Sequence, residues 1–581
     1  MKRSYSTTVR RVQAGLLALL LILPSLLTGC GGSAARENAE DGLYRAGDYE
    51  LTAFDKMTYM RPDMDALEAL FSATTQCAQE ASAGDRSKLI DLLERCWDAY
   101  DEFYTMETLA MLHNDIDRSD VYWEEEYSFC WENDVLLEQW LDETLIACAD
   151  SKASVPSRLL AGYDQGDSEP YSDRALELMS RENALLQDYW HVTELDEIQL
   201  NGRTVSYLDT ISDPLISNAD YTAANLAYSN AFNEAAAPIY ADLIRTRRAL
   251  AEELGFDSYE EYQYLLYARD YTPDQAASYL DQVAAVIAPY YREFMASDPY
   301  GRITYGTLSS PRLLSLLEQS VEQLGDTAAE ALSLMKKYHL YDVTSSDRKS
   351  PGAYTVYLDS YEAPFCFLGA YGDVEDLLDL AHEFGHFTDA YVNYNGTGSL
   401  DLAETYSQAM ANLVLLRLRD SLGDSAYHNL LLLHVLSNLS LYAEQSAYAD
   451  FESRAYQLSD EELTAEKLNA LALDCARRFG ADASDPDTAA TYWAQVNHLF
   501  EQPFYVISYC VSADAAIQIA QRELEEPGTG VACYEDILDW HEDAFLSEVE
   551  RVGLESPFAP GRARSNLDLV EDLLSYWKNA A

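Results

Sequence analysis

The chain has 581 residues, and its 99 acidic residues against 39 Lys and Arg residues give a formal net charge of −60. So acidic a surface argues against nucleic acid as a partner and against docking on anionic lipid headgroups. The length is sufficient for two or three domains, or for one large body with two lobes.

The amino terminus joins a basic segment to a short apolar run. Four basic residues occur before residue 12, and residues 14–27 are almost wholly apolar. The run is too short and too poorly bounded for a transmembrane helix, so it predicts a secretory signal peptide; an uncleaved signal anchor is the alternative. Its last residues, Leu27-Thr28-Gly29-Cys30, resemble a bacterial lipobox, which implies cleavage before Cys30 and attachment of lipid to its thiol.

This reading predicts the layout of the amino-terminal part. We expect residues 1–29 to be a lipoprotein signal peptide and residues 30–45 to be the lipidated Cys with a flexible tether of small residues. The mature protein would then be an extracytoplasmic lipoprotein of a bacterial cell membrane.

From about residue 51 onward the chain is typical of amphipathic helices, with Pro and Gly concentrated in connectors. The connector at residues 165–170 separates the amino-terminal helices from the rest of the chain. We expect an amino-terminal helical region at residues 46–190 and a second region at residues 191–581. Four cysteines fall in the first region: Cys77, Cys96, Cys130 and Cys148. Export would permit two disulfides among them, whereas buried free thiols fit the pattern equally well.

Two short apolar and aromatic runs, residues 354–359 and 364–369, predict strands. They precede the segment that carries most of the chemistry. An edge strand beside a reactive site can bind an extended peptide through its backbone. The alternative is that both strands are simply local core.

That segment is His382-Glu383-Phe384-Gly385-His386, which follows a helix start at residues 372–378. In a helix, residues four apart lie on one face, so both imidazoles can bind one metal ion. The pattern H-E-x-x-H is typical of zinc peptidases, in which the Glu is the general base. The sequence therefore predicts one Zn²⁺ per chain, bound by His382 and His386, with Glu383 as the base.

A zinc site of this kind needs a third protein ligand, and the downstream sequence offers a carboxylate. A second helix is expected behind Ser399, and Glu404 lies near its start, where the helix can fold back against the first. Asp401, one turn earlier, either orients a ligand or is simply favoured at a helix amino terminus.

A late segment carries two further candidates. Pro503 favours the first turn of a helix, and Tyr505 and Tyr509 are four residues apart, so both phenols would emerge on one face. Two hydroxyl groups on one face can donate to one oxyanion. Because the chain has 43 Tyr residues, ordinary packing is the alternative.

These residues together resemble the thimet oligopeptidase and oligoendopeptidase F family of zinc peptidases. The motifs are H-E-F-G-H, then Asp401-x-x-Glu404-x-x-Ser-Gln, then Trp493-x-x-x-x-His498 with Pro-Phe-Tyr505-x-x-x-Tyr509. The resemblance covers roughly residues 190–575. It implies Glu404 as the third ligand, and His498, Tyr505 and Tyr509 as active-site residues that stabilise the tetrahedral intermediate.

The resemblance also implies a mainly α fold, with two helical lobes around a deep channel and a small sheet beside the metal helix. Residues 191–581 would then be the catalytic region. The chain departs from the family pattern at Asp389, where a further His is frequent, and at Phe500, where a Tyr is frequent. The position of Asp389 is not a zinc ligand in the family, and Phe500 removes one possible hydrogen-bond donor.

The expected function is zinc-dependent hydrolysis of internal bonds in short, unstructured peptides. Two alternatives stay open: a peptide-binding lipoprotein without turnover, and a zinc amidase that acts on cell-wall peptides. The intact Glu383 argues against a pure binder, which has no need of a general base.

Overall fold

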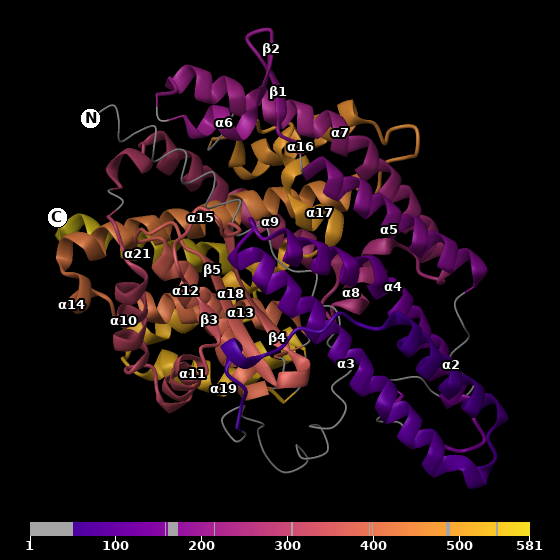
Figure 1. The fold of residues 1–581 in the computed structure, drawn as a ribbon. Helices are drawn as coiled ribbons and strands as arrows, with labels where there is room; N and C mark the ends of the chain where they lie inside the picture. The colour runs from indigo at the N-terminus through magenta and orange to yellow at the C-terminus, as the bar shows by residue number, and fades with distance from the viewer. Residues whose placement is uncertain are drawn as a thin grey trace. The chain divides into compact units, whose positions relative to one another are not determined.

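The computed structural model describes residues 50–156, 159–160, 172–193, 195–213, 215–303, 306–393, 396–397, 399–483, 488–541 and 544–580. The predicted signal peptide, Cys30 with its tether, and the connector at 165–170 lie outside the described residues. Helices dominate, and the sheets are small (Figure 1). The mainly α fold class with a small sheet is therefore confirmed. Within the described part, no helix combines the length and the apolar character needed to cross a bilayer.

The chain forms two compact units, each assembled from two separate stretches of sequence. We call one of them the sheet unit; its first stretch ends at Tyr171 and its second is Leu308–Gly398. We call the other the long-helix unit; it comprises Ser172–Thr307 and Ser399–Ala581. The chain thus leaves and re-enters each unit. The sequence regions predicted on either side of residue 190 stay a prediction.

The first stretch of the sheet unit contains three long helices, α2 (Met64–Glu80), α3 (Arg86–Ile116) and α4 (Val121–Ala149) (Figure 1). Asp63 and Asp120 cap α2 and α4 by accepting hydrogen bonds from Ala66 N and Tyr122 N. Leucine, aromatic and cysteine side chains fill the core between these helices. The eight cysteines from Cys77 to Cys533 are free thiols, so the disulfide alternative is not realised in the structure.

A three-stranded sheet follows, in the order β3 (Tyr341–Asp342), β5 (Ala363–Gly369), β4 (Gly352–Leu358). β3 runs parallel to β5, and β4 pairs antiparallel with β5 in the register Tyr354↔Phe367. Both predicted strands are present, and β4 is an edge strand of this sheet. Side chains alternate across it: the Tyr354 hydroxyl donates to Asp115 on α3, while Thr355 faces α12 (Asp376–Asn393).

The remaining helices of the sheet unit are α10 (Ser310–Val321) and α11 (Asp326–Lys337), which both pack against α12. Buried leucines and phenylalanines line one side of α12 and cover the sheet. The sheet thereby supports the helix that carries H-E-F-G-H.

The long-helix unit centres on a tightly packed pair, α13 (Leu400–Leu415) and α18 (Ile507–Glu525). Nearly every residue of both helices is buried. Helices surround the pair, and one hairpin of β1 (Glu197–Leu200) and β2 (Arg203–Ser206) pairs antiparallel. The surrounding helices are α5 (Asp173–Thr193), α6 (Tyr207–Ser212), α7 (Asn218–Glu253), α8 (Tyr259–Leu266), α9 (Pro273–Ala296), α14 (Arg419–Leu422), α15 (Asp424–Ala455), α16 (Ala465–Phe479), α17 (Asn497–Glu501), α19 (Thr529–Leu538), α20 (Phe545–Arg551) and α21 (Arg562–Ala580).

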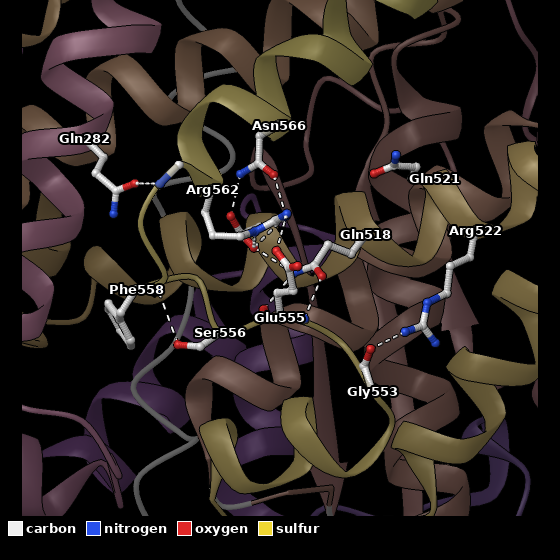
Figure 2. A network of polar contacts seen from close by, with 12 residues as sticks. Gln282, Gln518, Gln521, Arg522, Gly553, Glu555, Ser556, Phe558, Arg562 and Asn566 are labelled. Atoms are coloured by element: carbon white, nitrogen blue, oxygen red, sulfur yellow. Dashed lines mark hydrogen bonds and ion pairs between the residues drawn. The ribbon is translucent and has the colours of Figure 1, made fainter.

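A buried polar network fastens α18 to α21 (Figure 2). Arg562 contacts Asp514 Oδ1 through Nε and Nη2, both at 3.2 Å, and Asn566 Nδ2 donates to Asp514 Oδ2 at 2.5 Å. Gln518 exchanges two hydrogen bonds with the backbone of Glu555, in the loop that leads to α21. Because a buried charge is stable only when paired, this network fixes how α21 closes the unit.

Candidate active site

The helix that carries the two predicted histidines is fixed at its amino terminus by side-chain contacts. Asp376 accepts hydrogen bonds from the amides of Tyr371 and Gly372 at 2.8 and 2.7 Å, and Asp373 accepts one from the amide of Glu375. The predicted start near residues 372–378 therefore agrees with the structure, where α12 begins at Asp376. The carboxylates satisfy amides of the loop that leads into the helix.

His382 and His386 lie on one side of α12, as the four-residue spacing predicts. Their ring centroids are 5.0 Å apart and the ring planes meet at 79°. Burial lowers the pKa of His382 to about 4, and burial together with the neighbouring His382 lowers the pKa of His386. Both imidazoles are therefore neutral near pH 7, which is the state that offers a nitrogen lone pair to a metal ion.

Glu383 is buried between α12 and the edge strand β4. Thr355 Oγ1 lies 3.1 Å from Glu383 Oε2, to which it donates, and 2.9 Å from the Glu383 carbonyl oxygen. This threonine hydroxyl thus orients the predicted base. Thr355 was not among the residues predicted from the sequence, since a Thr in a strand carries no motif and only the fold brings it to α12.

Asp389, where the chain departs from the family pattern, orders the chain that follows α12. It accepts hydrogen bonds from Asn393 Nδ2 at 2.7 Å and from the Thr397 amide at 3.0 Å. Gly396 has φ +80°, and a Cβ there would lie 2.9 Å from Asp389 Oδ2. The departure therefore serves the turn toward α13.

Glu404, the predicted third ligand, is buried near the start of α13. The Tyr505 hydroxyl donates to Glu404 Oε1 at 2.7 Å, and Ser407 Oγ donates to Oε2 at 3.2 Å. Burial raises the pKa of Glu404 to about 7, against the opposing effect of these two hydrogen bonds. A cation beside this carboxylate would offset the cost of its burial.

His498, Tyr505 and Tyr509 form a compact aromatic cluster in the long-helix unit. The ring of Tyr505 lies 4.8 Å from that of His498 and 5.2 Å from that of Tyr509, and His498 Nε2 is 3.2 Å from the Tyr509 hydroxyl. The predicted helix start at Pro503 is wrong, because Phe504 adopts φ +63° and α18 begins only at Ile507. Tyr505 therefore lies in the turn before the helix, yet its ring still meets Tyr509.

Asp401 contacts a buried arginine. Its Oδ2 lies 3.7 Å from Arg269 Nε, and Tyr271 donates to its Oδ1 at 3.3 Å. Arg269 also donates to the Phe504 carbonyl oxygen and to Ser508 Oγ. Asp401 thus anchors the start of α13 to the turn that carries Tyr505. Sequence reasoning missed Arg269; its one signal is a lone cation in a segment rich in Tyr.

Each unit holds its own group of predicted site residues. The sheet unit brings together His382, Glu383 and His386, and the long-helix unit brings together Glu404, His498, Tyr505 and Tyr509.

Comparison with known proteins points to one family. Residues 54–154 match the model of the peptidase M3 N-terminal domain, and residues 322–544 match that of peptidase family M3. A chromosomal oligoendopeptidase F of Lactococcus lactis subsp. cremoris is 29% identical over 36% of this chain and 36% of its own length. An oligopeptidase PepF of Bacillus subtilis (strain 168) is 26% identical over 37% of this chain and 33% of its own length. The match thus spans about a third of each curated relative.

Solved structures share the fold along most of the chain. A structure of PZ peptidase A with inhibitor 2 has a TM-score of 0.72 at 20% identity, and covers 90% of this chain and 99% of that one. Oligoendopeptidase F from Enterococcus faecium has a TM-score of 0.56 at 14% identity, and covers 89% and 98%. At such identities the likeness concerns the fold.

Its fold and its H-E-F-G-H helix make the chain similar to helical peptidases of the H-E-x-x-H class. The two matching models relate it to peptidase family M3. The resemblance to the oligoendopeptidase F family is thereby confirmed at the level of the family.

Proposed function

We propose that the protein is a zinc-dependent oligoendopeptidase. The observation that carries the proposal is the pair of neutral imidazoles of His382 and His386, four residues apart on α12, with the buried carboxylate of Glu383 between them in sequence. With Glu404 these side chains offer two nitrogens and one carboxylate oxygen, one ligand atom each. That donor set suits one zinc ion with a position left open.

The chain's own groups supply the proton transfers. When bound, zinc supplies a Lewis acid that makes water more acidic and the peptide carbonyl more electrophilic. Glu383 accepts the proton of the attacking water and then delivers it to the leaving amine. Thr355 keeps the Glu383 carboxylate oriented for both transfers through the 3.1 Å contact. Burial of the base keeps bulk water from competing for the proton.

Tyr505 and Tyr509 of the aromatic cluster have different roles in this mechanism. A tyrosine hydroxyl has one proton to donate, and that of Tyr505 is directed at Glu404. Tyr505 therefore holds the Glu404 carboxylate, while Tyr509, supported by His498, donates to the oxygen that becomes negative during attack.

Short peptides are the proposed substrates, cleaved at internal bonds. The names of the two bacterial relatives, an oligoendopeptidase and an oligopeptidase, support this class. The edge strand β4 supports it as well, because a free strand edge beside Glu383 can pair with the backbone of an extended peptide whatever its side chains.

We also propose that the body is held at a bacterial cell membrane by lipid on Cys30, outside the cytoplasm. The support is the basic segment, the apolar run and the lipobox-like Leu27-Thr28-Gly29-Cys30. Labelling with a radioactive fatty acid tests this proposal: a Cys30→Ser chain should take up no label and should leave the membrane fraction.

A peptide-cleavage assay tests the activity. The body from Gly31 onward is incubated with a mixed library of short peptides and with one folded protein, and its zinc content is measured in parallel. Internal cleavage of the peptides, lost with a chelator and absent for the folded protein, is the expected result. One zinc per chain with peptide binding but no cleavage would instead indicate a binding lipoprotein, and cleavage confined to cell-wall peptides would indicate an amidase.

A further inference from the structure

The peptide unit at Phe504 has an unusual backbone conformation directly before Tyr505. Its φ is +63°, in the left-handed region that a residue with a side chain rarely adopts. Such a conformation persists only where the surroundings hold it, and it is commonest at functional sites. The Phe504 ring is buried and lies 4.9 Å from the ring of Tyr456.

Both polar groups of Phe504 are held by buried polar side chains. The Phe504 amide donates to Glu452 Oε2 at 2.7 Å, and Arg269 Nη2 donates to the Phe504 carbonyl oxygen at 2.7 Å. Glu452 and the Arg269 side chain are both 0% exposed. Hydrogen bonds are stronger away from water, and the one from the Arg269 guanidinium is also charge-assisted, so this turn is held from both sides.

The arginine connects this turn to two helices of the site. Arg269 Nη2 also donates to Ser508 Oγ at 2.8 Å, at the start of α18, and Arg269 Nε lies 3.7 Å from Asp401, one turn before Glu404 on α13. One guanidinium therefore contacts the first turns of both central helices. Glu452 Oε1 has no hydrogen-bond partner among the described residues. The bond from the Phe504 amide to Oε2 is therefore the hydrogen bond that this carboxyl group makes there, and we call it, together with the Arg269 bond, the clamp.

We propose that Glu452 and Arg269 are positioning residues, which hold the left-handed Phe504 peptide and thereby set the Tyr505 hydroxyl on Glu404 and the Tyr509 hydroxyl beside His498. The proposal rests on the proposed peptidase function of those residues. Without the clamp, Phe504 relaxes toward the ordinary backbone region and the neighbouring Tyr505 loses its 2.7 Å contact with Glu404.

Two substitutions of Glu452 separate positioning from packing. Glu452→Gln keeps an oxygen that accepts from the Phe504 amide, whereas Glu452→Leu has a similar volume and no acceptor. We expect the Leu variant to lose roughly 10- to 100-fold in kcat with little change in KM, since displacement of a reacting group by about 1 Å has that effect. The Gln variant should stay within about threefold of the parent chain. Equal kcat values for the two variants, both folded by thermal unfolding, would overturn the proposal.

A second pair of substitutions tests the backbone conformation itself. In the Glu452→Leu chain, Phe504→Gly and Phe504→Ala both remove the ring, and only Gly adopts a positive φ without strain. The Gly chain should therefore recover about fivefold in kcat over the Ala chain. Identical rates in the Gly and Ala chains would show that the left-handed peptide does not set the site.

Hydrogen exchange at the Phe504 amide tests the clamp independently of any hydrolysis. The amide should be protected in the parent and Gln chains and should exchange at least tenfold faster in the Leu chain. If the parent chain cleaves no peptide, the proposed function fails, and the exchange rate still decides whether Glu452 holds this turn. Unchanged exchange in the Leu chain overturns the clamp even where hydrolysis is normal.

Discussion

At the scale of single residues, the most specific prediction concerns Glu383. Glu383→Gln removes the base but keeps the size of the side chain, so kcat should fall by roughly 10²- to 10⁴-fold while the zinc content is unchanged. Steady-state hydrolysis of one library peptide and metal analysis of the same sample measure this. Glu322→Gln, an exposed carboxylate just after α10, is the matched control and should leave kcat unchanged. Full activity of the Glu383→Gln chain would remove this residue from the mechanism.

The two tyrosines of the aromatic cluster should fail in different ways. Tyr509→Phe removes a donor to the developing oxyanion, so kcat should fall roughly 10²- to 10³-fold with KM nearly unchanged. Tyr505→Phe removes the hydrogen bond to Glu404, so zinc affinity should fall by roughly 10- to 100-fold. Chelator competition measures the second effect. The reverse assignment, with zinc lost in the Tyr509 variant, would contradict the proposed division of roles.

Residues with a motif were predictable from the sequence, and residues without one were not. His382, Glu383 and His386 follow from helical spacing alone, because the chemistry needs those types at i, i+1 and i+4. Thr355, Arg269 and Glu452 act through contacts between segments far apart in the chain. Nothing in their local sequence distinguishes such residues from ordinary strand, loop or helix positions.

At the scale of helices and strands, the network around Asp514 predicts where the long-helix unit is most sensitive. Asp514→Ala removes the buried carboxylate paired with Arg562 and leaves it only the exposed Glu555 as an ionic partner, so the free energy of unfolding should fall by roughly 3–5 kcal/mol. Urea unfolding measured by circular dichroism checks this. Asp568→Ala breaks an exposed ion pair with Arg564 on α21 and should change stability within experimental error. A similar loss in both variants would show that the network of Figure 2 does not hold α21.

The elements themselves were largely predictable, and their exact ends were not. The strands before α12 and the start of α12 followed from apolar runs and from capping carboxylates. The start of α18 did not: Pro503 favours a helix start, yet the clamped Phe504 peptide delays the helix to Ile507. Local propensity was outweighed here by two buried polar side chains from distant segments, Glu452 and Arg269.

At the scale of the whole molecule, the net charge predicts how the melting temperature depends on salt. A formal net charge of −60 makes the folded chain repel itself. Raising NaCl from about 0.01 M to about 0.5 M shortens the screening length from about 30 Å to below about 8 Å, so Tm should rise. Calorimetry measures the shift, with choline chloride as a control that should give the same result. A Tm that falls with salt would mean that specific ion pairs outweigh the general repulsion.

The helical class could be predicted because it depends on composition and periodicity, which are local properties. The two interleaved units could not, because they depend on where the chain returns after a long excursion. The stretch Leu308–Gly398 joins the amino-terminal helices although a stretch of the long-helix unit lies between them in sequence.

This interleaving restricts how the gene can be cut. The chain passes between the units after Tyr171, after Thr307 and again after Gly398, so a fragment that ends at Thr307 holds the opening stretch of each unit and the complete form of neither. Expression of a contiguous half therefore yields neither unit complete, and a chain stalled midway through synthesis exposes two unfinished cores. A working unit on its own requires a rearranged gene, in which the two stretches of one unit are joined by a new linker.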